Sequence, residues 1–353
     1  MPETLEDKLV IGISSRALFD LAEANEVFES EGLSAYRRYQ REHEHETLGP
    51  GTALPLVRGL LAVNERAGEQ LVEVIIVSRN DADSAMRVLR SIDAHGLDIT
   101  RGVFRGGRDP WQLLDALSCD VFLSAEPSQV RKAHEQGVPA AQIMPGATAA
   151  DQGDLSEVRI AFDGDAVLFD AESQRVYDEE GLDAFHEYEA RHADEPLSPG
   201  PFRPFLEGLA RIQARFAGTA PVRTALVTAR GAPAHYRVVN TLRAWGVQVD
   251  ETYFLGGVDK AEALAAFGAN IFFDDQLTHV TSASRRVPAA QVLWSDEEVP
   301  AAPAQSPVVI KVPRPGGKRG AAPPQPELGL EELSPPHAGD RPEAPSEPSR
   351  SGR

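Results

Sequence analysis

Residues 158–169 of this chain read VRIAFDGDAVLF. The first five are mostly apolar, which is typical of a strand buried on both faces of a sheet. Asp163 and Asp165 follow directly and flank one glycine. Such a pair alone favours a simple turn, because Asp and Gly both suit turns. Other motifs along the chain indicate more than a turn.

Three later stretches repeat the strand pattern, with helix-like stretches among them. We predict strands over residues 158–162, 223–227, 252–255 and 270–273, and helices over residues 233–245 and 260–267. This alternation predicts an α/β fold in which a parallel sheet has helices on both faces. A long segment after the first strand reads as a helical insertion, residues 172–193 and 202–216. It would lie above the strand ends, where open α/β sheets bind ligands.

Polar side chains follow these strands. Thr228 stands in LVTAR, Lys260 at a predicted helix start, and Asp274 and Asp275 in IFFDDQ. The carboxyl ends of parallel strands meet at one edge of a sheet, so we expect these groups to share a crevice with Asp163. Packed carboxylates repel one another, and Mg²⁺ is bound by carboxylates, water and substrate phosphate. The pattern therefore favours a magnesium site.

The same residue types suit phosphoryl transfer. A carboxylate can attack phosphorus and form an aspartyl-phosphate. A second carboxyl two residues on can protonate the leaving oxygen and then take a proton from water. Lys260 would neutralise the phosphoryl group, and Thr228 would hydrogen-bond to its oxygens.

An internal repeat divides the chain. At a shift of 149 residues EGL recurs (31–33 and 180–182), as does VPAAQ (138–142 and 287–291), and a shift of 150 aligns much of the segment between. We expect two halves of one fold, residues 1–150 and 151–299. Residues 300–353 hold 13 of the 27 prolines, and this composition predicts a disordered tail.

Composition excludes several classes of protein. The chain has 353 residues and a net charge of −19, which argues against a nucleic-acid polymer as partner. Its one cysteine, Cys119, forms no intrachain disulfide and suits inert core. The first residues lack the apolar region of a secretory signal, and no apolar run approaches the length of a membrane helix. We expect a cytoplasmic protein without a membrane partner, and a homo-oligomer is compatible with the sequence.

The order of these motifs resembles the haloacid dehalogenase (HAD) superfamily. More closely, the chain is similar to the cytosolic 5'-nucleotidase type I family over about residues 8–295, through SSRALFD, SRND, LDIT, AFDGDAVLF, VTAR and IFFDDQ. The resemblance implies two tandem HAD-like (Rossmannoid) parallel-sheet halves, each with a helical cap insertion. In the second, catalytic half the cap would span about residues 170–220.

The resemblance also implies an activity: Mg²⁺-dependent hydrolysis of nucleoside 5'-monophosphates. Asp163 would be the nucleophile and Asp165 the general acid and base. The Asp163 carboxylate, the Asp165 backbone carbonyl and Asp274 would hold the metal, with Asp275 in support. The phosphate would be bound by Thr228, Ala229 and Lys260.

The first half lacks these carboxylates. Through the repeat, the second-half residues correspond to Ser14, Arg16, Ser78, Pro110, Ser124 and Ala125. This half should bind no Mg²⁺. Ser14, Arg16, Ser78 and Arg79 would suit a phosphate bound without metal. They could hold a regulatory nucleotide or contribute to the substrate site. The alternative is a structural half in which Arg16 pairs with a local acid.

Two other activities stay open at this point. One is a phosphatase of the same mechanism for another small phosphate, such as a sugar phosphate. The other is a non-catalytic nucleotide-binding or regulatory protein. Phe185, Tyr188 and Phe202 are candidates for stacking on a base or for cap core packing, and His279 is isolated in the sequence.

Overall fold

The computed structural model describes residues 5, 7–147, 157–216 and 219–293. The predicted tail lies outside the described residues. The first half alternates strands and helices in the order β1 (Leu9–Ile13), α1 (Ser15–Leu18), α2 (Ala22–Glu31), α3 (Leu33–Glu42), α4 (Leu54–Ala67), β2 (Val72–Ser78), α5 (Met86–Ala94), β3 (Arg101–Phe104), α6 (Gln112–Ala116), β4 (Val121–Ser124), α7 (Pro127–Glu135) and β5 (Ala140–Ile143).

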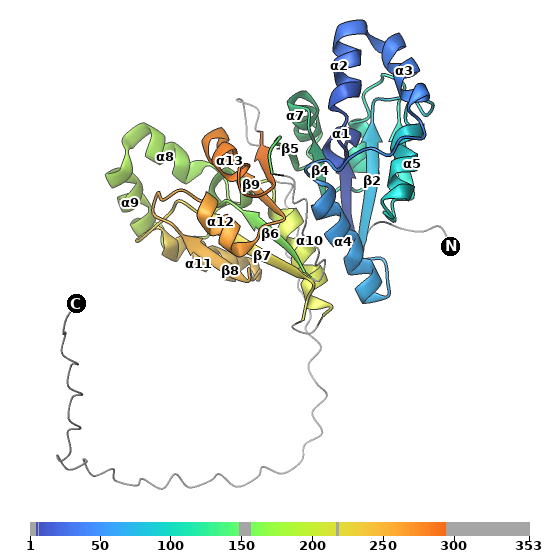
Figure 1. Ribbon diagram of the computed structural model, residues 1–353. Coiled ribbons are helices and arrows are strands. Elements are labelled where there is room, and N and C mark those ends of the chain that lie inside the picture. The colour runs from blue at the N-terminus through green and yellow to red at the C-terminus, as the bar shows by residue number, and fades with distance from the viewer. Residues whose placement is uncertain (1–4, 6, 148–156, 217–218, 294–353) are drawn as a thin grey trace, which may run out of the picture. The chain divides into compact units, whose positions relative to one another are not determined.

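The second half follows the same order (Figure 1). Its elements are β6 (Val158–Phe162), the π-type turn η1 (Gly164–Leu168), α8 (Glu172–Glu180), α9 (Leu182–Arg191), α10 (Arg203–Ala214), β7 (Val222–Thr228), α11 (His235–Trp245), β8 (Glu251–Phe254), α12 (Ala261–Phe267), β9 (Ile271–Asp274), α13 (Leu277–Ala283) and β10 (Ala289–Val292). The strands and helices predicted here are confirmed, with ends shifted by a residue or two. The sequence did not predict α13 or β10.

One sheet of ten strands runs through both halves in the order β3-β2-β1-β4-β5-β10-β9-β6-β7-β8. Neighbours pair in parallel except at the centre, where β5 and β10 are antiparallel. There Gln142 faces Gln291, the corresponding residue of the other VPAAQ segment. The prediction of an α/β fold with a mostly parallel sheet is confirmed.

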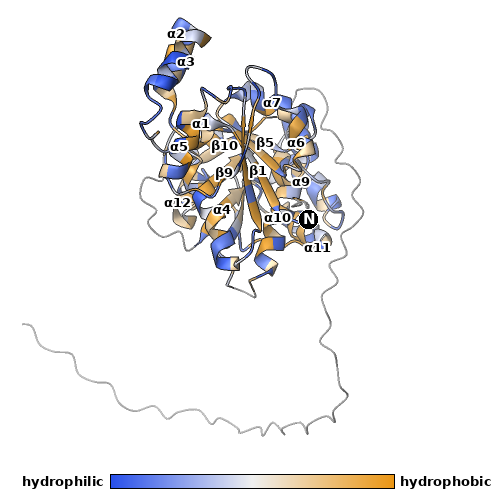
Figure 2. Cartoon of the chain, turned by 90° about the vertical axis from the view of Figure 1, so that its right-hand side faces the viewer, coloured by the Kyte–Doolittle hydropathy of each residue, from blue (hydrophilic) through white to orange (hydrophobic). Residues whose placement is uncertain are grey.

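The inner strands are buried because helices cover the sheet on both faces. All residues of β1 and β2 are buried, as expected for parallel strands linked by helical crossovers. In Figure 2 the strands are the apolar centre, and the helices turn polar faces outward. Cys119 is buried core as predicted, and burial raises the pKa of its thiol to about 12. Among the described residues, no helix has the length and apolar character needed to cross a membrane.

The halves also contact each other through two glycines. A Cβ atom at Gly59 of α4 would lie 3.0 Å from Val158 Cγ2 of β6. At Gly208 of α10 it would lie 2.6 Å from Leu9 Cδ1 of β1. The two pairs correspond through the 149-residue shift, so the contact is reciprocal. A larger residue at either position would force the opposing side chain to shift, because each helix approaches the strand of the other half closely.

In each half, one helical hairpin follows the first strand. The α2–α3 hairpin comes after β1, and the α8–α9 hairpin comes after β6 and η1 (Figure 1). In contrast, α10 packs on the sheet, where it buries Phe205 and Leu209 and contacts β1 and β7. Within residues 170–220, α10 is therefore part of the layer on the sheet, whereas α8 and α9 pack on each other and α8 contacts η1 after β6.

Candidate active site

The strand ends bring most of the predicted residues together. Asp163 follows β6, Thr228 ends β7, and Asp274 ends β9. The strands β7 and β9 flank β6 in the sheet. Because Phe162 lies opposite Phe273, the carboxylates that follow them are neighbours. Lys260 reaches this edge from the start of α12.

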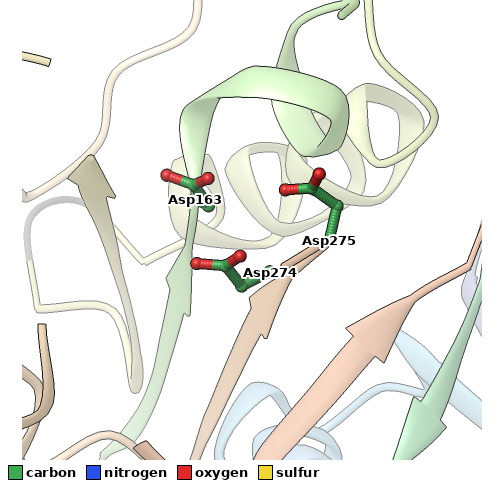
Figure 3. Close-up of side chains that lie close together, drawn as sticks. All are labelled: Asp163, Asp274 and Asp275. Atoms are coloured by element: carbon green, nitrogen blue, oxygen red, sulfur yellow. The ribbon is translucent and has the colours of Figure 1, made fainter. Parts of the chain in front are cut away.

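Three carboxylates form the centre of the site. Oxygen atoms of Asp163, Asp274 and Asp275 lie within 4.8 Å of one another (Figure 3). Lys260 Nζ lies 2.8 Å from Asp163 Oδ1 and 2.6 Å from Asp274 Oδ2. Lys260 is only 2% exposed, and Asp274 is fully buried. One ammonium therefore faces three acidic groups with little water to screen them.

The acidic groups respond differently to this environment. Burial and the neighbouring carboxylates raise the pKa of Asp163 to about 7, although Lys260 opposes the shift. Burial, Asp163 and Asp274 raise the pKa of Asp275 to about 8. Burial also acts on Asp274, but His279 and Lys260 outweigh it and lower the pKa of that carboxyl. Burial opposes the charge of Lys260, yet Asp163 and Asp274 raise its pKa.

This cluster fits a hard divalent cation. Asp275 Oδ1 is buried and accepts no hydrogen bond from any described residue. Leaving a buried acceptor unsatisfied is costly, and ionising two carboxyls beside Asp274 is costly too. A cation bound by carboxylate oxygens would remove both costs. Asp163, Asp274 and Asp275 can therefore hold a metal.

Asp165 lies outside the carboxylate cluster. Its side chain accepts two hydrogen bonds from Arg230, from Nε at 2.8 Å and from Nη2 at 2.6 Å. Only its backbone remains available as a candidate metal ligand in this arrangement. The next residue, Ala166, has a φ of 57°, an uncommon conformation for a residue other than glycine. The chain turns sharply directly after the second of the two candidate catalytic carboxylates.

Thr228 and Ala229 lie beside the Asp163 loop. Thr228 is 1% exposed, and its Oγ1 accepts a hydrogen bond from the Arg230 amide at 3.2 Å. That oxygen would be 3.3 Å from a Cβ atom placed on Gly164, which shows how closely the β6 and β7 loops approach. The hydroxyl is therefore close to the backbone of the loop that carries Asp163 and Asp165.

Sequence reasoning missed four residues at this edge. His279 Nδ1 lies 3.2 Å from Asp274 Oδ2, so His279 is not isolated. Arg230, Glu189 and Arg237 form ion pairs that reach Asp165. Arg230 lies in the VTAR motif and could have been noticed beside the strand end. Glu189 lies in the middle of α9, and no motif in the sequence distinguishes it from the other polar residues of that helix.

The corresponding residues of the first half have protein partners. Ser14 Oγ caps α1 by accepting from the Ala17 amide, and Ser78 Oγ accepts from the Asn80 amide. Arg16 forms an ion pair with Glu126. Arg79 donates to the Gly107 carbonyl and lies 3.5 Å from Asp109. A phosphate here would have to compete with these carboxylates.

The three aromatic candidates differ in exposure. Phe202 is fully buried against Phe205 and Phe273, so it packs in the core and stacks on no ligand. Phe185 is buried and lies under the guanidinium of Arg230. Tyr188 lies against His192. Packing within the α8–α9 hairpin and against the sheet accounts for these rings.

Comparison with known proteins agrees with this arrangement. The model of a protein family described as 5'-nucleotidase matches residues 1–298. Cytosolic 5'-nucleotidase 1B of Homo sapiens is 36% identical over 296 residues, which cover 80% of this chain and 48% of the human protein. The chain thus spans about half the length of that curated relative. No solved structure matches the chain. The chain belongs to the 5'-nucleotidase family.

Proposed function

We propose that the chain hydrolyses nucleoside 5'-monophosphates to nucleoside and phosphate. The observation that carries the proposal is the position of Lys260 between Asp163 and Asp274 in a three-carboxylate cluster. Such a site can bind a cation and a phosphoryl group together. The name of the human relative supports the nucleotide as substrate. It also supports a cytoplasmic location.

In the proposed reaction, an Asp163 oxygen bonds to phosphorus while the bond from phosphorus to the 5'-oxygen breaks. Asp165 gives its proton to that oxygen, which leaves as the nucleoside hydroxyl. Water then attacks phosphorus, Asp165 takes a proton from it, and the bond to Asp163 breaks. Lys260, the Thr228 hydroxyl and the Ala229 amide hold the phosphoryl oxygens throughout.

We propose Mg²⁺ as the metal, because carboxylate and carbonyl oxygens with substrate phosphate are the ligands it prefers. The Asp163 carboxylate, the Asp165 carbonyl and Asp274 would hold it, and Asp275 would support them. The metal would supply charge stabilisation for the transferring phosphoryl group.

The domain assignment belongs to the same proposal. Residues 151–299 would be the catalytic HAD-like half, with α8 and α9 as the core of its cap, and residues 1–150 a degenerate half. The shared strand order of the halves supports this division. A metal-free phosphate site at Ser14, Arg16, Ser78 and Arg79 is a separate proposal. Titration of Asp163→Asn protein with nucleotides tests it, and a single site per chain, unaffected by Arg16→Ala, would rule it out.

Phosphate release from the purified protein tests the main proposal. The panel contains nucleoside monophosphates and sugar phosphates, with Mg²⁺ or with EDTA. We expect release from a nucleoside monophosphate that needs Mg²⁺ and is lost in Asp163→Asn. The matched control is Asp115→Asn, which changes an exposed carboxylate of α6. Release from sugar phosphates alone would select the other phosphatase class. No release from any compound by folded protein with Mg²⁺ would favour a nucleotide-binding protein.

A further inference from the structure

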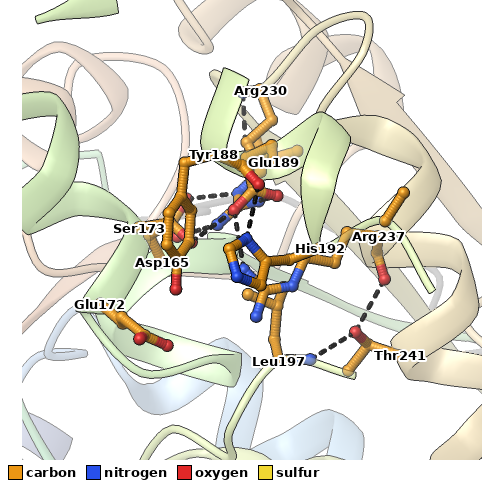
Figure 4. A network of polar contacts seen from close by, with 12 residues as sticks. Asp165, Glu172, Ser173, Tyr188, Glu189, His192, Leu197, Arg230, Arg237 and Thr241 are labelled. Atoms are coloured by element: carbon orange, nitrogen blue, oxygen red, sulfur yellow. Dashed lines mark hydrogen bonds and ion pairs between the residues drawn. The ribbon is translucent and has the colours of Figure 1, made fainter. Parts of the chain in front are cut away.

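A chain of buried ion pairs connects the cap to the candidate site (Figure 4). Arg230, in the loop after β7, uses Nε and Nη2 to bind both oxygens of Asp165. Its remaining nitrogen, Nη1, donates to Glu189 Oε2 of α9 at 2.5 Å. Arg237 Nη1 and Ser173 Oγ donate to the other Glu189 oxygen, at 3.0 and 2.6 Å. The α8–α9 hairpin thereby contacts Asp165 through one guanidinium.

Burial makes these pairs strong and mutually dependent. The side chain of Arg230 is 2% exposed and that of Glu189 is fully buried. Burial opposes the charge on Arg230, but Asp165 and Glu189 outweigh it and raise its pKa. Two guanidinium groups balance two carboxylates, and removing one partner would leave a buried charge unpaired. The guanidinium of Arg230 fits a carboxylate through two parallel bonds, which fixes orientation as well as position.

The first half serves as an internal comparison. At the positions of Asp165, Arg230 and Glu189 it has Arg16, Asn80 and Gln40. Asn80 and Gln40 both donate to the Tyr36 hydroxyl, so a neutral network takes the place of the ion pairs. The α2–α3 hairpin folds without buried charge at these positions. The ionic chain therefore occurs in the half with the carboxylate cluster and is not a requirement of the hairpin fold.

We propose that Arg230 is a positioning residue for Asp165. Because Glu189 of α9 binds Arg230, this positioning depends on where the α8–α9 hairpin lies. The inference rests on the proposed function, in which Asp165 is the general acid and base. A guanidinium only donates, so both Asp165 oxygens act as acceptors in the paired state. When one of the two bonds opens, that oxygen can carry the proton to the leaving group, while the other bond keeps the carboxyl in place.

The dependence of kcat/KM on the leaving group tests this role. A nucleoside is a poor leaving group that needs a proton, whereas para-nitrophenolate leaves without one. Because kcat/KM reports the steps up to leaving-group departure, the later attack of water does not obscure the comparison. The substrates are para-nitrophenyl phosphate, phenyl phosphate and the nucleoside monophosphate cleaved fastest by the wild-type protein.

Arg230→Lys keeps the positive charge but loses the two parallel hydrogen bonds to Asp165. We expect kcat/KM for the nucleoside monophosphate to fall about 100-fold, the lower range for loss of a positioned general acid. For para-nitrophenyl phosphate it should fall less than about tenfold, with phenyl phosphate between the two. The matched control is Arg87→Lys. Arg87 corresponds to Arg237 in the first half, where Gln40 stands at the position of Glu189 and the acidic partner of Arg87 is the exposed Glu46. All three values should therefore stay within about twofold.

Glu189→Gln tests the contribution of the cap. It should give the same leaving-group pattern with a smaller loss, because Glu189 acts through Arg230. The double variant should be no worse than Arg230→Lys, since residues that act in one chain are not additive. If Arg230→Lys does not fold, as judged by circular dichroism, the dependence of kcat/KM on the leaving group in Glu189→Gln decides whether the inference holds.

The outcomes separate this inference from the proposed function. Selective loss with the nucleotide supports the inference. An equal loss with all three substrates, or no loss, overturns it while the wild-type activity still stands. If the wild-type protein cleaves none of the substrates, the proposed function itself is wrong.

Discussion

Lys260 Nζ lies 2.8 Å from Asp163 Oδ1, and this ion pair links the start of α12 to the end of β6 at the candidate site. The same nitrogen lies 2.6 Å from Asp274. A single buried ammonium thus holds two strand-end carboxylates near each other. It neutralises part of their charge, and in the proposed reaction it would also be available to the phosphoryl oxygens.

Replacement of this ammonium should abolish most of the activity. In Lys260→Met, the phosphoryl group loses a charged donor, so we expect phosphate release to fall about 10²–10³-fold. The metal-free protein should also unfold at lower urea, because two buried carboxylates lose their partner. Steady-state kinetics and urea unfolding in EDTA measure the two effects. Lys132→Met, which breaks an exposed pair with Asp109, is the control and should change neither. Full activity of Lys260→Met would contradict its assigned role.

For a substitution at Asp275 we predict the opposite effect on the stability of the metal-free protein. The pKa of Asp275 is raised to about 8 by burial, Asp163 and Asp274, so its carboxylate is unfavourable there without a cation. Asp275→Asn should raise the free energy of unfolding in EDTA by about 1 kcal/mol or more. The same variant should gain less stability from added Mg²⁺, because a metal support is gone. Urea unfolding with EDTA and with Mg²⁺ gives both values. Equal stabilisation of variant and wild-type protein by Mg²⁺ would show that Asp275 does not support the metal.

Much of the site's layout follows from local sequence. Asp163, Thr228, Lys260 and Asp274 lie together because each one ends a strand, directly follows a strand or caps the start of a helix, and parallel strands end at one edge. Such positions can be read from short motifs. The pair between Arg230 and Glu189 could not be read in this way. It depends on how the α8–α9 hairpin folds back, and no periodicity in the sequence specifies that angle.

The two strands at the centre of the sheet, β5 and β10, were not predicted from the sequence. The VPAAQ segments contain proline, alanine and glutamine, which are weak strand formers. They become strands because each pairs with a neighbouring β-strand and with the other copy, where Gln142 faces Gln291. Tertiary pairing here overrides local preference. The repeat in sequence identified the two segments as equivalent, but it did not indicate that they meet.

Gly200 should be intolerant of even a methyl group. A Cβ atom there would lie 2.3 Å from the Phe169 carbonyl oxygen and 2.5 Å from that of Val167, and backbone atoms cannot move aside easily. Gly200→Ala should therefore lower the free energy of unfolding by about 3 kcal/mol, as in overpacked cores. Because the contact is with the η1 turn, activity should fall as well. Gly49→Ala is the control, since its Cβ would meet only Asp20 Cβ at 3.8 Å. Equal urea midpoints for the two variants would contradict the steric argument.

Acid should destabilise the protein in part through His134 of α7. Burial lowers the pKa of this imidazole to about 4, although its contact with the Ala140 carbonyl favours the charged form. In the unfolded chain the pKa is about 6.5. The unfolded state therefore binds the proton first, so the contribution of His134 to stability is complete above about pH 6.5 and is lost as the pH falls toward 4.

A shift of this size corresponds to about 3 kcal/mol between pH 7 and pH 4. In His134→Gln, which cannot take up a proton, that part of the pH dependence should vanish. The difference in unfolding free energy between pH 7.5 and pH 4.5, measured by urea, should be smaller than in the wild-type protein by about 2 kcal/mol. His45→Gln, at an exposed histidine, should match the wild-type protein. The same pH dependence in His134→Gln and wild-type protein would mean that other groups cause the acid sensitivity, and that His134 takes up its proton in the folded state at an ordinary pKa.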